Sequence, residues 1–224
     1  NFGYGVTVDS NGNVYVTGPT DDNLDGQTNA GVRDVFLSKF DSSLNKQWTK
    51  LLGTVNSDYV NGITTDGNGN IYLTGYTWGA FDGNTSIGAY DIFLAKYDPS
   101  GAKQWVRQWG STADDEGRGV AVDSNNDIYV TGHVNGSVDG VNSLGGGDIF
   151  LTKFDSSGTK QWTKLFGTAD HDAANGIALD INNNIYLTGE TSGNMGGTIN
   201  LGQGDVFLIK CDSAGNQLWA KLLG

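Results

Sequence analysis

The sequence predicts an all-β protein, a β-propeller of four 57-residue blades with four antiparallel strands each. The first observation behind this prediction is a repeat. The segment GVTVDSNGNVYVTG at residues 5–18 recurs at 62–75, 119–132 and 176–189, always 57 residues further on. The second is that every repeat holds four short runs of β-branched and aromatic residues, separated by turn-forming Gly, Asn and Asp. Such sheets stack radially, because one four-stranded sheet cannot bury both of its faces alone.

The strands of the first repeat are expected at residues 6–8, 14–17, 35–40 and 47–52. Asn11-Gly12 lies between the first two, and this pair strongly favours a tight hairpin turn. A long segment rich in Gly, Asp and Asn separates the second strand from the third, which makes the repeat longer than most blades. We call these segments the long loops: residues 19–33, 76–90, 133–147 and 190–204.

The third strand is apolar at successive positions, as in the VFL run at residues 35–37. Strands that are buried on both faces have this pattern, and it fits a blade packed between two others. The fourth strand of each repeat has a tryptophan at the position of Trp48, and its wide ring can cover the seam between blades. Cys211 stands where Phe40 stands in the first repeat, which predicts a buried thiol rather than a reactive one.

The four repeats fill the chain, and we expect a single domain. An open array would leave two apolar blade faces exposed, so a closed four-bladed ring is favoured. A piece of a longer array and an eight-bladed ring made from two chains are the alternatives. The expected blades span approximately residues 1–53, 54–110, 111–167 and 168–224.

The net charge of −12 argues against nucleic acid and anionic membrane surfaces as partners, because both attract basic patches. No run of about 18 apolar residues occurs, so no membrane insertion is expected. Residues 1–224 contain no signal sequence, and any targeting segment is expected outside them.

Each repeat has a Gly and an Asp around its first strand, an NVYVTG-type second strand and a third strand of the type D[VI]FL-x-K-[FY]-D. This pattern resembles the bacterial β-propeller repeat family SBBP. The resemblance covers the whole chain, with two departures at Cys211 and Gly196. It implies a propeller in a secreted or surface-exposed bacterial protein, beside other modules, and no single activity. An extracellular or cell-surface location is therefore expected.

Binding residues are expected on the long-loop edge, because the loops differ among repeats while the turns are nearly uniform. One set precedes the first-strand Gly and should ring the mouth of a central channel. A second set follows the Thr-Gly of the second strand. Trp78 and Phe81 occur in the second loop alone and form either a sugar-stacking or protein-contact patch, or an anchor for that loop. The first set is Tyr4, Asn61, Arg118 and Asn175. The second set is Tyr76, His133 and Glu190, and Pro19 is the equivalent residue of the first repeat.

Acidic residues make the long loops a candidate Ca²⁺ site. The alternative is that the loop-closing aspartates accept hydrogen bonds from loop amides. The hairpin turn Asp9-x-Asn11-x-Asn13 matches only the start of an EF-hand loop, and turn capping explains it better. An ion bound in the central channel is a third candidate, and no cofactor is required by any motif. The candidate ligands are Asp25, Asp82 and Asp139 before Gly, and Asp34, Asp91 and Asp148 at the loop ends.

The sequence contains no HExxH, GxSxG or phosphate-loop motif, so we expect no enzyme. The favoured function is a non-catalytic binding or scaffold module that contacts protein or glycan through the long-loop edge. One alternative is a structural assembly unit that self-associates. The other is a hydrolase that uses the carboxylates of Asp114, Asp115 and Glu116.

Overall fold

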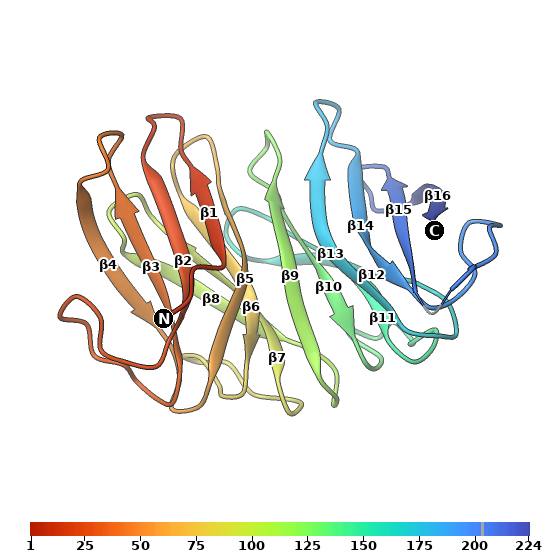
Figure 1. The fold of residues 1–224 in the computed structure, drawn as a ribbon, viewed down its shortest axis with the longest axis horizontal. Coiled ribbons are helices and arrows are strands. Elements are labelled where there is room, and N and C mark those ends of the chain that lie inside the picture. The colour runs from red at the N-terminus through yellow and green to blue at the C-terminus, as the bar shows by residue number, and fades with distance from the viewer. Residues whose placement is uncertain (203) are drawn as a thin grey trace.

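The computed structural model describes residues 1–202 and 204–224, and these residues form sixteen strands in four separate sheets (Figure 1). Each sheet takes four consecutive strands in chain order and pairs them antiparallel. The all-β prediction with four strands to a sheet is thus confirmed. The strands are β1 Gly5–Val8, β2 Val14–Thr20, β3 Asp34–Phe40, β4 Lys46–Leu52, β5 Asp58–Thr65, β6 Ile71–Thr77, β7 Asp91–Tyr97, β8 Lys103–Trp109, β9 Asp115–Val122, β10 Ile128–Val134, β11 Asp148–Phe154, β12 Lys160–Phe166, β13 Asp172–Leu179, β14 Ile185–Thr191, β15 Asp205–Cys211 and β16 Gln217–Leu223.

The hairpin turns gain their shape from one carboxylate per repeat. Asp9 Oδ1 accepts hydrogen bonds from the backbone N–H groups of Asn11 and Asn13, each at 2.9 Å. Asp9 Oδ2 accepts from Asn13 Nδ2 at 2.8 Å and from the buried Tyr15 hydroxyl at 3.0 Å. Asp66, Asp123 and Asp180 accept the corresponding backbone and tyrosine bonds in the other repeats. Turn capping, rather than metal binding, therefore occupies these oxygens.

Neighbouring blades pack through two different faces. Tyr15, Val35 and Leu37 of the first blade share one apolar cluster with Ile71, Leu73 and Phe93 of the second. The next two seams repeat this arrangement with the equivalent residues. The interior strands are therefore buried on both faces, as the apolar runs predicted.

At the outer edge of each seam, a tryptophan lies on the turn of the next blade. A Cβ built on Gly101, whose φ is +82°, would lie 3.0 Å from the Trp48 ring. Gly158 and Gly215 meet Trp105 and Trp162 in the same way. Glycine is needed there both for its positive φ and for the close approach of the ring.

The four blades form an open arc, and the closed four-bladed ring favoured from the sequence is not what the structure shows. Figure 1 places the first and fourth blades at opposite ends of the molecule. Val206 in the fourth blade is 49% exposed, while the equivalent Val35, Ile92 and Ile149 are fully buried. A closed ring would cover Val206 with the first blade, as the next blade covers its equivalents at the three internal seams.

Cys211 is buried, as predicted, and burial raises the pKa of its thiol to about 12. No helix in the described part of the chain is long and apolar enough to cross a membrane.

Candidate functional site

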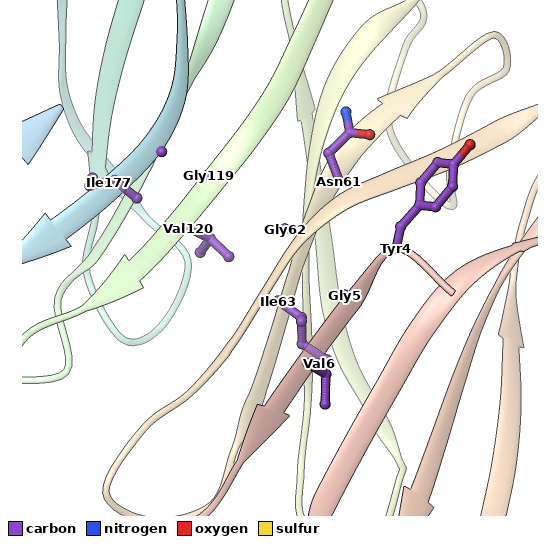
Figure 2. A pocket seen from close by; sticks show the side chains of 10 residues that line it. Tyr4, Gly5, Val6, Asn61, Gly62, Ile63, Gly119, Val120 and Ile177 are labelled. Carbon is purple, nitrogen blue, oxygen red and sulfur yellow. The ribbon is translucent and has the colours of Figure 1, made fainter. Parts of the chain in front are cut away.

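The inner strands of the arc line an axial cavity of about 390 Å³ (Figure 2). Its walls come from β1, β5, β9 and β13, and Tyr4 and Asn61 project beside it. These two residues belong to the set expected at the channel mouth. The other eight lining residues are glycine, valine and isoleucine, which offer little polar chemistry.

The polar members of this set are bonded across blades. Arg118 Nη1 donates to Asn175 Oδ1 at 2.7 Å, and Asn61 Nδ2 donates to the Gly117 carbonyl at 2.9 Å. Arg118 also forms an ion pair with Glu116 at 3.1 Å. These contacts tie three inner strands together.

A second surface lies on the long-loop edge of the second blade, where four aromatic rings follow one another. Tyr59 stacks on Tyr76 with ring centroids 4.8 Å apart and an interplanar angle of 11°. Tyr76 contacts Tyr90 at 5.0 Å, and Tyr90 contacts Trp78 at 6.1 Å with an angle of 23°. We call these four residues the aromatic row. Trp78 at its end is 50% exposed, so one large apolar face is open to solvent.

A cavity of about 390 Å³ opens beside Trp78 and Tyr90, and Asn56, Ala89 and Asp114 complete its lining. Asn56 Nδ2 donates to the Trp78 carbonyl at 2.9 Å, which holds the loop backbone in place. Burial, and after it the negative charge of Asp114, raises the pKa of the Tyr90 phenol. The cavity thus combines two aromatic rings with an amide and a carboxylate.

Arg33 closes the other end of the aromatic row. Its guanidinium carbon lies 4.9 Å from the Tyr59 ring centroid, and its Nη1 donates to the Tyr59 hydroxyl. Asp21 holds the guanidinium in an ion pair at 2.5 Å. The row therefore runs from a cation in the first long loop to an exposed indole in the second.

The aromatic row belongs to the second repeat alone. The counterparts of Trp78 are Asp21, Asn135 and Ser192, and the position of Tyr90 holds Arg33 and Gly147 in the first and third repeats. The sequence analysis selected Tyr76 and Trp78 but missed Tyr59 and Tyr90. The signal for them was present, since in no other repeat are all four of these positions aromatic.

The structure contradicts two of the predicted exposed residues. Phe81 is only 3% exposed and packs edge-on against Phe93 at 5.3 Å, so it anchors the loop and is not part of an open patch. His133 is buried beside His171, with ring centroids 5.7 Å apart. Burial lowers the pKa of His133 to about 4, and the charge of Arg118 acts in the same direction. Glu190 is exposed, and it lines a cavity of about 190 Å³ together with His171.

The loop aspartates chosen as Ca²⁺ ligands have lysine partners. Asp25 and Lys46 form an ion pair at 2.6 Å, and the same pair recurs as Asp82 with Lys103 and Asp139 with Lys160. In the fourth repeat the Asp position is Gly196 and the Lys position is Gln217, so both partners change together. That joint change is a sequence signal for the ion pair.

The loop-closing aspartates accept hydrogen bonds from loop amides, which was the alternative interpretation. Asp34 accepts from Ala30 N at 2.8 Å, and Asp91 and Asp148 accept from the equivalent amides at 2.9 Å. Within residues 1–202 and 204–224, no group of three or more His, Cys, Asp or Glu side chains is placed to hold a metal ion.

The carboxylates considered for a hydrolase are mostly engaged. Asp115 is buried and accepts from the Ser111 hydroxyl at 3.0 Å and from Asn135 N at 3.0 Å. Glu116 pairs with Arg118, and only Asp114 faces the cavity beside Trp78. The trio therefore does not present two carboxylates across one cleft.

Comparison with known families agrees with this architecture. The SBBP family model, described as a beta-propeller repeat, matches residues 2–25, 47–82, 104–137 and 161–195, which make up more than half of the chain. This chain belongs to the SBBP beta-propeller repeat family. The three later matched segments each join the fourth strand of one blade to the hairpin of the next, so the SBBP pattern spans the seams.

Two curated proteins are similar to this SBBP-repeat chain. The regulatory protein FlaEY of Caulobacter vibrioides is 28% identical over 193 residues, which cover 76% of this chain and 20% of that protein. An uncharacterized WD repeat-containing protein of Acanthamoeba polyphaga mimivirus is 26% identical over 227 residues, which cover 79% of this chain and 16% of that protein. The chain thus spans a fifth or less of these relatives' lengths.

Among solved structures, a gluconolactonase from Xanthomonas campestris superposes with a TM-score of 0.55 at 14% identity, over 97% of this chain and 61% of that one. At this identity the likeness concerns the fold alone.

Proposed function

We propose that this chain is a non-catalytic binding module that holds a carbohydrate against the exposed end of the aromatic row. The observation that carries the proposal is the open face of Trp78, set beside Tyr90 in a cavity that also contains Asp114 and Asn56. Aromatic rings pack against the apolar C–H face of a sugar, while amide and carboxylate groups can bond its hydroxyls.

The rigidity of the site supports this proposal. The loop is fixed by buried Phe81, whose N–H donates to Gln108 Oε1 at 3.0 Å, and by the Asn56 bond to the Trp78 carbonyl. A preorganised site loses less conformational entropy when a ligand binds. A location outside the cell or on its surface is part of the same proposal, and fractionation of cells that produce the full-length protein tests it.

A protein partner at the same row is the second candidate. It is favoured by the names of the curated relatives, one a regulatory protein and the other a WD repeat-containing protein. Tryptophan and tyrosine are also the residues most enriched at the energetic centres of protein interfaces.

A glycan array followed by affinity electrophoresis in soluble polysaccharides tests the proposal. We expect the wild type to be retarded by at least one polysaccharide and Trp78→Ala to migrate as in an empty gel. Ile87→Ala is the matched control, because Ile87 lies in the same loop, is 51% exposed and does not line the cavity. If no array spot binds, or if Trp78→Ala and Ile87→Ala behave alike, carbohydrate binding at the aromatic row is excluded and the protein partner remains.

A further inference from the structure

The arc ends in two unpaired blade faces that differ from one another. The face of the first blade, which we call the entry face, carries Val6, Val8, Val14, Val16, Phe36 and Phe40. The face of the fourth blade, which we call the exit face, carries Tyr186, Thr188, Val206, Leu208, Trp219 and Leu223. Both are apolar at their centres, and their residues are half-buried or exposed, which leaves them more open to solvent than the equivalent residues of the interior blades.

These two faces are the two sides of every internal seam. The exit-face residues correspond to Tyr15, Thr17, Val35, Leu37, Trp48 and Leu52, which cover the second blade. The entry-face residues Val14, Val16, Phe36 and Phe40 correspond to Ile71, Leu73, Phe93 and Tyr97, which receive the first blade. Within residues 1–202 and 204–224, one copy of each half of this interface is therefore not covered by another blade, while the same interface forms three times inside the arc.

We propose that the exit face of one copy docks on the entry face of a second copy, head to tail, in the register of the internal seams. The partner is a second copy of this chain because its entry face has the size and residue types that an exit face covers elsewhere in the molecule. A contact between two different faces is heterologous, so it either closes a ring or continues from copy to copy.

Polar groups at the seams fit the same register. Lys39 Nζ donates to the Pro99 carbonyl in the turn of the next blade at 3.1 Å, and Lys96 Nζ donates to Ser156 O at 3.0 Å. Lys210 is the equivalent residue on the exit face, where it lies 5.2 Å from the Tyr186 ring centroid. In the docked pair, its ammonium reaches the turn that contains Ser42 of the second copy.

One position differs from the internal seams, and it sets the strength of the contact. Leu44 has a φ of +63° and is 70% exposed, at the place where Gly101, Gly158 and Gly215 each receive a tryptophan. In the docked pair Trp219 would meet the Leu44 side chain, and the outer edge of the seam must shift. We therefore expect a reversible association that Leu44→Gly tightens roughly tenfold, as removal of about 1.4 kcal/mol of overpacking would. The net charge of −12 opposes the association, so added salt should strengthen it.

The test measures mass against protein concentration by light scattering, at low and high salt, with circular dichroism to check folding. The wild type should rise above the mass of one chain, and Leu44→Gly should do so at lower concentration. Leu144→Gly is the control, because Leu144 is an exposed loop leucine away from both faces, and its curve should match the wild type.

Two charge variants test the head-to-tail sense. Val8→Glu disables the entry face, and Val206→Glu disables the exit face; both residues are exposed, so both variants should fold. Each variant alone should stay at the mass of one chain, and an equimolar mixture should form a complex of one copy of each. Folded wild type and folded Leu44→Gly that stay at one-chain mass throughout would overturn the proposal. The proposal would also be overturned if the wild type forms a dimer and only one of the variants Val8→Glu and Val206→Glu prevents it.

Discussion

The two edges of the blades behave differently, although the same repeats build both. At the edge with the hairpin turns, at the top of Figure 1, one aspartate per repeat is fully bonded by its own turn in all four copies. At the long-loop edge the repeats diverge, and the second repeat alone carries an aromatic row that ends in an exposed indole. Repetition thus marks residues that hold a blade together, and the residues available for binding lie among those that depart from it.

The largest effect is expected where the repetition is strictest. Asp66→Ala removes the acceptor for two backbone amides, for Asn70 Nδ2 and for the buried Tyr72 hydroxyl. Leaving a buried hydroxyl unpaired and a turn uncapped should lower the free energy of unfolding by about 4 kcal/mol. Urea unfolding of the wild type and of Asp66→Ala measures this loss of stability. A loss below about 1 kcal/mol would mean that the turn carboxylate is not a main stabiliser of the blade.

A smaller effect on the free energy of unfolding is expected from His133, a buried residue at the long-loop edge. Its native pKa of about 4 lies below the ordinary 6.5, so the folded state favours the neutral ring. The resulting stability is present above pH 6.5 and is lost as the pH falls through 4, by roughly 3 kcal/mol. Urea unfolding of the wild type and of His133→Phe at several pH values measures this pH-dependent loss of stability. The difference in stability between them should shift in favour of the variant as the pH falls, and a constant difference would contradict the buried neutral state.

Trp78→Ala should lower the free energy of unfolding by no more than about 2 kcal/mol, well below the loss from Asp66→Ala, because half of the indole is already in water. Thermal unfolding beside Ile87→Ala checks this. A loss of several kcal/mol would make Trp78 part of the scaffold and remove the contrast between the two edges.

The smallest effect is expected from metal ions. Lysine ammonium groups already pair with Asp25, Asp82 and Asp139, so Ca²⁺ has little to gain by displacing them. The melting temperature with CaCl₂ and with EDTA should agree within about 1 °C. A clear rise of the melting temperature with CaCl₂ that is absent in Asp34→Asn would restore the hypothesis that the long loops bind Ca²⁺.

Much of the fold could be predicted from the sequence, because a repeat shows the same local solution four times. The Asn11-Gly12 turn, the strand runs and the burial of Cys211 each follow from local pattern. Closure of the ring could not be predicted, because it depends on the angle between blades. Large side chains such as Phe93 and Tyr72 fill the seams, and the sequence pattern does not give the angle at which they pack.

The candidate site could be predicted only in part. Trp78 and Phe81 look alike in the sequence, and only the packing of the loop turns Phe81 inward against Phe93 while Trp78 stays exposed. Tyr59 lies on β5 and Tyr90 at the far end of the long loop that contains Trp78, and the fold brings them into one row. Comparison of the repeats position by position would have identified them, since only the second repeat is aromatic at both of these positions.

The separation of the two edges is the central claim, and one paired measurement tests it most directly. Polysaccharide affinity and urea unfolding are measured on the same preparations of wild type, Asp66→Ala and Trp78→Ala. We predict that Asp66→Ala loses stability and, below its unfolding transition, keeps the wild-type affinity, while Trp78→Ala keeps most of its stability and loses affinity. If the two variants lose stability and affinity in parallel, the edges are not separate and the account is wrong.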